Sequence, residues 1–218
     1  MPLNASRIHL ERFVERAAAS IGADALVLDA GAGDGAYRGH FARQRYESAD
    51  FAQVDKPYDA DITYLGDLAA LPIDDDRFDL VLMTQVLEHL PDPLAVLREL
   101  RRVLKPGSQI WASCPLFYEE HEQPYDFYRY TQFGLRHLFE RAGYAEIEIE
   151  WLEGYLATVG YELDVAARAL PPRAGPLHPL RPLRFMLERA SELAARSDVR
   201  RKRTDRGHPK NYTVVAVA

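Results

Sequence analysis

The stretch Val27-Leu28-Asp29-Ala30-Gly31-Ala32-Gly33-Asp34-Gly35-Ala36-Tyr37 decides the fold of this chain. The residues from Ala25 to Leu28 form a short apolar run, which is long enough for a buried strand and too short for a helix. Asp29 ends the run, and three glycines follow at every second position. Because glycine takes positive φ and has no Cβ, the chain can turn sharply there and a ligand can lie against the backbone.

The residues after this turn predict a helix over 35–45, whose free N–H groups and partial positive end would point back at the turn. A strand, a glycine turn and a helix form the first unit of a nucleotide-binding α/β fold. The chain has no Gly-Lys-Ser/Thr at this point, which argues against a P-loop. Gly31, Gly33 and Ala36 also fit the dinucleotide pattern, so a nicotinamide-dependent oxidoreductase stays open here.

Predicted strands alternate with predicted helices through the first half of the chain. The strands are 25–28, 46–50, 61–65, 78–83 and 109–113, and the helices are 6–21, 35–45 and 94–104. This alternation predicts an α/β fold with a doubly wound, mostly parallel sheet that binds ligands at the carboxyl ends of its strands. Asp29, Asp50, Asp67 and Thr84 fall at such ends. Asp50 also lies about 20 residues past the glycines, where nucleotide folds place the acid that binds ribose hydroxyls.

The second half begins with a polar and aromatic loop over 116–130. Thr131 is predicted to cap a helix over 132–142 that ends at Gly143. Alternating apolar residues predict a strand over 145–151, and a β-rich segment over 212–217 follows much later. Between these strands, residues 154–210 are predicted to form a helical insertion or lid inside a single domain of 1–218. Its helices are expected at 155–170 and 183–195, with a proline-rich break between them and a mobile basic surface loop at 200–203.

Composition excludes several classes of function. The net charge of −6 gives no electrostatic case for a nucleic-acid partner. No apolar run is long enough to span a bilayer, and charged residues interrupt the N-terminal segment where a signal peptide would need its apolar core. The single cysteine, Cys114, rules out an internal disulfide and a cysteine-based zinc site. A reducing, cytoplasmic location is therefore expected.

Five short motifs, taken in this order, resemble the class I S-adenosylmethionine (SAM) methyltransferases, and in particular the broad type-11 group. They cover residues 28–35, 66–72, 78–81, 86–93 and 102–107. The resemblance implies a Rossmann-like seven-stranded sheet whose last strand is antiparallel, and SAM as the cofactor. It also implies a role for particular residues. The cofactor would be bound by Asp29, Gly31, Ala32, Gly33, Gly35, Asp50, Phe51, Asp67, Leu68, Thr84, Gln85 and His89.

The resemblance also implies which of these residues would contact each part of the cofactor. Asp29 would hold the turn or the amino group of the methionine part, and the glycines would let the backbone approach the cofactor. Asp50 would accept hydrogen bonds from both ribose hydroxyls, which a carboxylate does well. Asp67 and Leu68 would meet the adenine. Thr84 and Gln85 would line the methionine end.

The loop after the fifth strand resembles the His-x-x-Pro-x-Asp-Phe/Tyr-x-Arg-Tyr-Thr segment of a methyltransferase subgroup associated with cell-surface polysaccharides and natural products. It runs from His121 to Thr131. His121 is the candidate general base, and aromatic side chains such as Tyr125 would line the acceptor pocket. Arg129 could bind a phosphate or carboxylate, or simply pair with an acid of its own loop. No metal is expected, because the sequence shows no ligand pair at a fitting spacing.

These observations predict a SAM-dependent methyltransferase that acts on a small-molecule or sugar-containing (glycan-type) acceptor, at oxygen, and leaves S-adenosylhomocysteine (SAH). Two alternatives stay open, namely a nicotinamide-dependent oxidoreductase and a SAM-binding protein without turnover. A homodimer is an option for its assembly, to which the helix expected at 155–170 could contribute.

Overall fold

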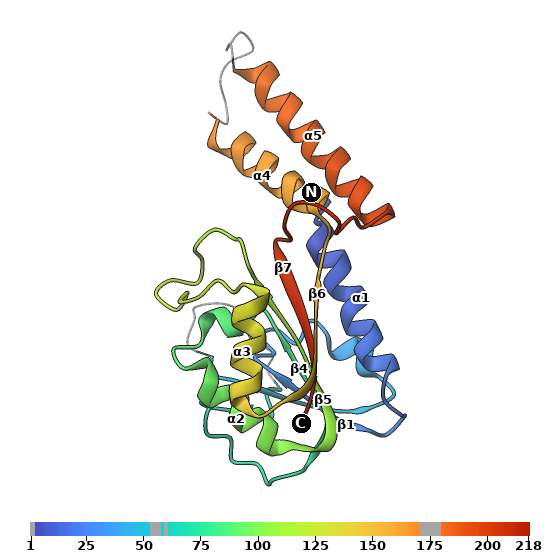
Figure 1. The fold of residues 1–218 in the computed structure, drawn as a ribbon, viewed down its shortest axis with the longest axis vertical. Helices are drawn as coiled ribbons and strands as arrows, with labels where there is room; N and C mark the ends of the chain where they lie inside the picture. Colours follow the sequence, from blue (N-terminus) through green and yellow to red (C-terminus); the bar gives the residue numbers. More distant parts are fainter. Residues whose placement is uncertain (1–2, 53–57, 59–60, 171–179) are drawn as a thin grey trace. The chain divides into compact units, whose positions relative to one another are not determined.

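The computed structural model describes residues 3–52, 58, 61–170 and 180–218 (Figure 1). The chain forms two compact units, one of residues 1–10 with 151–211 and one of residues 11–150 with 212–218. Both contain residues that are far apart in the sequence. No helix in the described part of the chain is long and apolar enough to cross a membrane.

A seven-stranded sheet has the order β3-β2-β1-β4-β5-β7-β6. The first five strands pair in parallel, with Asp29 opposite Ser48 on one side and opposite Leu82 on the other. Their bounds are β1 Leu26–Ala30, β2 Arg45–Asp50, β3 Tyr64–Leu65, β4 Phe78–Thr84 and β5 Leu104–Pro115. The predicted α/β fold with a doubly wound sheet is confirmed, and β1 and β4 are buried along nearly their whole length, as expected of central parallel strands.

The far end of the sheet is antiparallel. β6 (Ala145–Trp151) and β7 (Asn211–Val217) follow β5 in the sheet, with β7 between the other two. Ala218, just after β7, exchanges backbone hydrogen bonds with Gly107 and Ser108 near the start of β5, so β7 runs against β5. This confirms the reversed last strand implied by the family resemblance.

The helices α2 (Pro93–Val103) and α3 (Gln132–Ala142) lie side by side along the sheet (Figure 1). Side-chain oxygens cap both N-termini, because Asp92 accepts from the Ala95 amide and Thr131 accepts from the Gly134 amide. Leu97 and Leu100 of α2 are fully buried. The helix α1 (Ala5–Ala19) packs the Phe13 ring 5.0 Å from the ring of Trp111 on β5.

The prediction of a crossover helix over 35–45 is wrong. Only the short 3-10 helix η1 (Arg38–Phe41) forms there, between turns. The physical reason lies in the segment itself, where Gly35 and Gly39 each raise the cost of helix formation by about 1 kcal/mol. Gly33 and Gly35 also adopt positive φ, which no right-handed helix accepts.

The unit of residues 1–10 and 151–211 contains the two insertion helices, α4 (Tyr155–Ala169) and α5 (Arg181–Arg200). Its buried polar centre is Asp198, which contacts His9 Nε2 at 3.0 Å and accepts from the Gly154 amide at 3.1 Å. The prediction of two helices is confirmed, although α5 is longer than expected and includes Arg200 of the basic run. Most of the proline-rich break lies in 171–179, outside the described residues. The roles of the insertion as a lid and of 1–218 as one domain stay predictions.

Candidate functional site

A pocket of about 230 Å³ opens at the carboxyl ends of the parallel strands. Residues that directly follow β1 and β4, and the last residue of β2, contribute to it. Its described lining consists of Gly31, Asp50, Phe51, Ala52, Tyr58, Asp67, Leu68, Gln85, Val86, His89, Leu90, Pro91, Glu122, Tyr125 and Phe127. This is the edge of the sheet at which an α/β fold of this kind binds its ligands.

The glycine turn connects β1 to this pocket by two separate effects. Gly31 has φ +84°, and a Cβ built on it would lie 2.3 Å from a methyl carbon of Val86. Gly31 is therefore required for packing against the segment after β4. Gly33, with φ +57°, has no atom within 4 Å of such a Cβ, so the turn is open at this residue. Its amide donates to Asp50 Oδ2 at 2.9 Å.

Two carboxylates border the pocket. Asp50 is fixed in place, because the amides of Gly33 and Ala52 donate to its two oxygens at 2.9 and 2.8 Å. Each carboxylate oxygen has a second lone pair, so Asp50 can still accept from a bound hydroxyl. Asp67 accepts from the Ala69 amide through Oδ1 at 2.9 Å and is otherwise exposed. Asp50 and Asp67 are thus two hydrogen-bond acceptors on one pocket.

Asp29 lies beside this pocket but does not line it. Its carboxyl group is buried and accepts a hydrogen bond from the Tyr46 hydroxyl. Burial raises the pKa of Asp29 to about 7, while the hydrogen bond from Tyr46 acts in the opposite direction. The residue is therefore an internal acid at the end of β1, and its proposed contact with a cofactor stays a prediction.

The structure brings many of the predicted cofactor residues to the pocket and leaves others out of its lining. Lining residues from the predicted set are Gly31, Asp50, Phe51, Asp67, Leu68, Gln85 and His89, and Tyr125 lines the pocket from the predicted acceptor loop. Residues outside the lining are Asp29, Ala32, Gly33, Gly35, Thr84, His121 and Arg129. Several lining residues had not been predicted, namely Ala52, Tyr58, Val86, Leu90, Pro91, Glu122 and Phe127.

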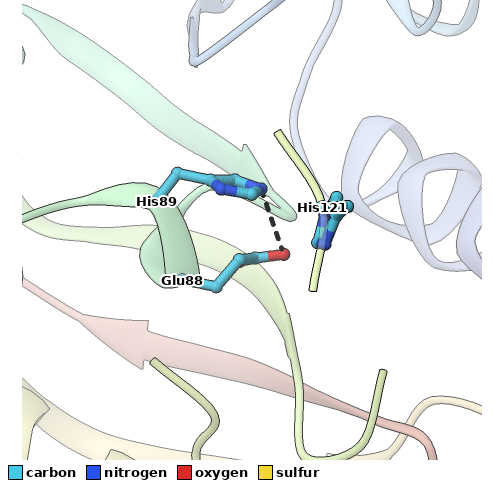
Figure 2. Close-up of side chains that lie close together, drawn as sticks. All are labelled: Glu88, His89 and His121. Carbon is cyan, nitrogen blue, oxygen red and sulfur yellow. Dashed lines mark ion pairs between the residues drawn. The ribbon is translucent and has the colours of Figure 1, made fainter. Parts of the chain in front are cut away.

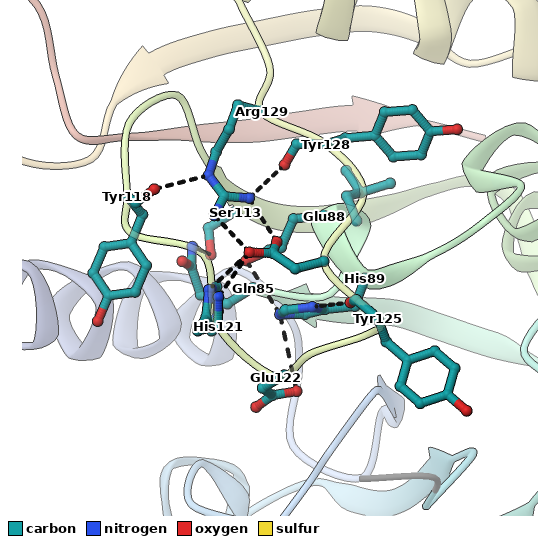
Figure 3. Close-up of polar contacts among 12 residues, drawn as sticks. Gln85, Glu88, His89, Ser113, Tyr118, His121, Glu122, Tyr125, Tyr128 and Arg129 are labelled. Carbon is teal, nitrogen blue, oxygen red and sulfur yellow. Dashed lines mark hydrogen bonds and ion pairs between the residues drawn. The ribbon is translucent and has the colours of Figure 1, made fainter.

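The aromatic loop after β5 is tied to the short 3-10 helix η2 (Leu87–His89) that follows β4. The amides of Phe127 and Tyr128 both donate to the Glu88 carbonyl, at 2.8 and 3.2 Å. The Tyr130 hydroxyl donates to the Leu87 carbonyl at 2.9 Å. These bonds explain how residues more than thirty positions apart in the chain come to share one site (Figure 3).

Arg129 holds this loop together. Its guanidinium binds the Asp126 carboxylate through two nitrogens, at 2.6 and 2.8 Å, and also donates to the carbonyls of Tyr118, Glu119 and Tyr128 (Figure 3). The Arg129 guanidinium lowers the pKa of Asp126 to about 2. With its donors directed at the loop, Arg129 is placed to position other residues. The predicted binding of an acceptor by Arg129 stays a prediction.

Glu88, His89 and His121 gather beside the pocket, with one ligand-type atom of each within 4.8 Å of the others (Figure 2). The Glu88 side chain is 0% exposed, and neither of its oxygens has a hydrogen-bond partner elsewhere in the described chain. Burial raises the pKa of Glu88 to about 8, and burial lowers the pKa of His89. The His89 and His121 rings meet edge to face, with centroids 4.7 Å apart.

Glu88 lies within the motif over 86–93 but was not among the predicted site residues. A Glu-His pair at the end of a strand gives no sign of which side chain will be buried. The close approach of His121 depends on the fold of the loop over 116–130, and no local pattern encodes that fold. The signal available was the coincidence of two histidines and a glutamate in the two loops that follow β4 and β5.

Residues 28–112 match a family model described as a methyltransferase domain. In this part of its length, the chain carries a methyltransferase domain. The demethylmenaquinone methyltransferase of Bacillus subtilis strain 168 is 39% identical over 67 residues, which are 31% of this chain and 26% of that protein. The chain spans from 16% to 55% of the length of eight curated relatives to which it is similar.

Solved structures show the same fold for this methyltransferase domain. A SAM-dependent methyltransferase from Archaeoglobus fulgidus aligns with a TM-score of 0.60 at 16% identity, over 97% of this chain and 94% of that one. A phosphoethanolamine N-methyltransferase 2 from Haemonchus contortus, in complex with S-adenosyl-L-methionine, aligns with a TM-score of 0.57 at 16% identity, over 100% of this chain and 53% of that one.

The cofactor of this domain family is S-adenosyl-L-methionine, and the residues of the pocket fit it. Asp50 and Asp67 supply two acceptors, which suit the ribose hydroxyls and the adenine amino group. Phe51 and Leu68 add apolar surface for the adenine, and the open turn at Gly33 leaves room beside the backbone. The methyltransferase interpretation and its cofactor, predicted from the sequence, are confirmed at the level of the domain.

Proposed function

We propose that this chain is a SAM-dependent methyltransferase whose acceptor is a hydroxyl group of a small molecule or sugar-containing compound. One observation supports this most strongly. The cofactor pocket, which contains Asp50 and Asp67, also contains His89, and His89 belongs to the cluster with Glu88 and His121. Groups that are suited to hold a cofactor therefore lie next to groups that are suited to take up a proton.

The residues of the pocket are proposed to bind and orient. When bound, S-adenosyl-L-methionine supplies a methyl group that is already activated by a sulfonium, so the protein mainly provides position and orientation. Asp50 would hold the ribose hydroxyls and Asp67 the adenine. Gln85, fixed by donating from Nε2 to the Ser113 hydroxyl at 3.1 Å, would line the methionine end.

A hydroxyl acceptor must also lose its proton. Oxygen is favoured as the methylated atom because the cluster of Glu88, His89 and His121 beside the pocket offers groups that can take part in this proton removal. His121 is our candidate base, and Tyr125, which lines the pocket, is placed on the acceptor side. Arg129 would act by positioning this loop. A cytoplasmic location belongs to the same proposal, since the single cysteine, Cys114, is free and buried.

Thermal unfolding with SAH or with NAD tests the cofactor, because only a ligand that binds the folded state raises the melting temperature. We expect a shift with SAH and none with NAD. SAH formation is then measured with hydroxyl, amine and activated-carbon acceptors, and turnover with hydroxyl compounds alone is expected. Stabilisation by NAD alone would contradict the proposal. Tight SAM binding without turnover on any acceptor would favour a binding protein instead.

A further inference from the structure

Glu88 is a buried acid whose two carboxyl oxygens have no hydrogen-bond partner elsewhere in the described chain. Burial of a carboxylate with so few partners is strongly unfavourable, so a group of this kind either keeps its proton or is neutralised by a cation. His89 Nε2 lies 3.9 Å from Glu88 Oε1 and 4.0 Å from Glu122 Oε2. The carboxyl group of Glu88 points toward the two histidines and not toward solvent (Figures 2 and 3).

Both histidines have one ring nitrogen occupied by an oxygen of the protein. His89 Nδ1 lies 2.6 Å from the Tyr125 carbonyl, which can only accept, so this nitrogen carries the proton. His121 Nδ1 lies 3.2 Å from the Glu119 carbonyl and 3.4 Å from Asp126 Oδ2, which fixes it in the same way. Nε2 of each ring then has its lone pair available. Histidines that bind metals show this pattern, with the other nitrogen donating to a carbonyl or carboxylate.

We propose that Glu88, His89 and His121 bind one divalent transition-metal ion. Two ligand atoms of a single Zn²⁺ are at most about 4.2 Å apart, because each lies about 2.1 Å from the ion. The three ligand atoms here are within 4.8 Å of one another, so movements below about 1 Å would bring them around an ion. Two imidazoles with one carboxylate suit Zn²⁺ or Fe²⁺ better than Mg²⁺ or Ca²⁺, which prefer oxygen ligands.

The expectation that the chain binds no metal rested on spacing along the sequence. His89 and His121 are 32 positions apart, and the hydrogen bonds from the loop to the Glu88 carbonyl are what bring them together. Three protein ligands leave coordination positions open, as in catalytic metal sites. Since His89 lines the cofactor pocket, those positions adjoin the place where an acceptor would bind.

The role of the ion deepens the proposed function and rests on it. A metal-bound hydroxyl group loses its proton more easily, because the cation stabilises the oxygen anion. The proton passes to water, the oxygen forms its bond to the methyl carbon, and the carbon–sulfur bond breaks with its electron pair remaining on sulfur. The products are a methyl ether, neutral SAH and one proton. In this form of the site His121 is a ligand of the ion, and the ion takes over the task of the general base.

Metal binding is tested on the full chain after treatment with a chelator, by calorimetric titration with Zn²⁺ alone. We expect one ion per chain. Co²⁺ bound in place of Zn²⁺ should give visible absorption that reports nitrogen and oxygen ligands. Glu88→Gln keeps the size of the side chain and removes its charge, and His121→Ala changes a partly exposed loop residue. Each should weaken Zn²⁺ binding by about a hundredfold or more, because the loss of outer contacts to a metal ligand alone costs 10–100-fold.

His137→Ala is the matched control, because His137 is an exposed histidine on α3 away from the cluster, and Zn²⁺ binding should be unchanged. SAH binding is measured on the same samples, and its retention in His121→Ala shows that the fold is intact. No Zn²⁺ binding by the native chain, or a Zn²⁺ affinity in Glu88→Gln and His121→Ala equal to that of the native chain, would overturn the metal site. Zn²⁺ binding without any SAH binding would leave the metal site standing and refute the proposed function.

Discussion

At the scale of single residues, the proposed cofactor pocket is lined by two carboxylates with different surroundings. Asp50 is held by two backbone amides and is nearly buried, whereas Asp67 is exposed and accepts from one amide. Replacement of Asp50 would free two amides and disturb the glycine turn as well as any ligand. Asp67 is therefore the cleaner residue with which to measure the contribution of a carboxylate to cofactor binding.

We expect Asp67→Ala to weaken SAH binding by about 1–3 kcal/mol, through the loss of a hydrogen bond to the adenine. Calorimetric titration of SAH measures this directly. Asp74→Ala is the control, because Asp74 is also an exposed aspartate but does not line the pocket. Equal affinities of the Asp67 variant and the native chain would remove this residue from the site.

The buried carboxyl group of Asp29 leads to a prediction about how the free energy of unfolding depends on pH. Its pKa is raised to about 7 in the folded chain, against 3.8 as the ordinary value, so the folded state holds a proton that the unfolded state has released. The free energy of unfolding due to this group therefore falls as the pH rises from about 4 to about 7, by at most about 1.4 kcal/mol per pH unit. Asp29→Asn removes this fall. The free energy of unfolding of the variant, relative to that of the native chain, should therefore rise as the pH rises.

Urea unfolding of both proteins at pH 5 and pH 8, without ligand, measures that rise. Asp24→Asn, at an exposed aspartate, is the control, and it should change the free energy of unfolding much less. A stability difference for Asp29→Asn that is the same at both pH values would show that burial does not raise the pKa of Asp29.

At the scale of the elements, Arg102 joins α2 to the segment that follows Asp67. Its guanidinium donates to Glu99 on the same helix at 2.7 Å, to Asp75 at 2.5 Å and to the Ile73 carbonyl at 2.8 Å. Glu99 in turn accepts from the Leu71 amide at 2.8 Å. The loop between β3 and β4 is therefore fixed by two paired side chains of α2, Arg102 and Glu99, and Asp67 stands at the beginning of that loop.

We expect Arg102→Met to lower the free energy of unfolding by about 1–2 kcal/mol, which allows for the partial exposure of the ion pairs. Arg102 lowers the pKa of Glu99, so the difference from the native chain should be present at neutral pH and shrink as the pH falls below about 4. Arg98→Met is the control on the same helix, because Arg98 makes one long bond to the Arg141 carbonyl. Equal losses in the two variants would contradict this role of Arg102.

Elements with a clear period were predictable from the sequence. The helix over 132–142 and the strand over 145–151 are found at those bounds, since Thr131, Gly143 and the alternating isoleucines mark them locally. The segment over 35–45 fails because its glycines serve the turn and not a helix. The cluster of Glu88 and two histidines was not predictable, because hydrogen bonds between two loops decide which side chains meet, and such bonds have no local pattern.

At the scale of the whole molecule, the presence of two compact units raises the question of whether a change in one unit affects ligand binding in the other. Asp198 is buried in the unit of residues 1–10 and 151–211, where it contacts His9 and Gly154. We expect Asp198→Ala to destabilise that unit by about 1–3 kcal/mol, because it leaves the Gly154 amide without its acceptor. All described residues of the cofactor pocket lie between 31 and 127, in the other unit, so SAH affinity should stay within about twofold.

Hydrogen exchange measured by mass spectrometry separates these effects. Faster exchange in α4 and α5 with unchanged exchange in β1 and β4 is expected for Asp198→Ala. Asp164→Ala, which removes an exposed i,i+4 ion pair with Arg168 on α4, should change neither. A collapse of SAH affinity in Asp198→Ala would show that the insertion supports the cofactor pocket.

The position of β7 in the sheet has a consequence for biosynthesis. β7 is the last strand in chain order, yet it lies between β5 and β6. In a nascent chain on the ribosome, the backbone N–H and C=O groups of both strands that later pair with β7 therefore lack partners until residues 211–217 have emerged. Such edges favour pairing between chains. Premature termination within this strand should yield a product that aggregates, even though every residue of the cofactor pocket has already been synthesised.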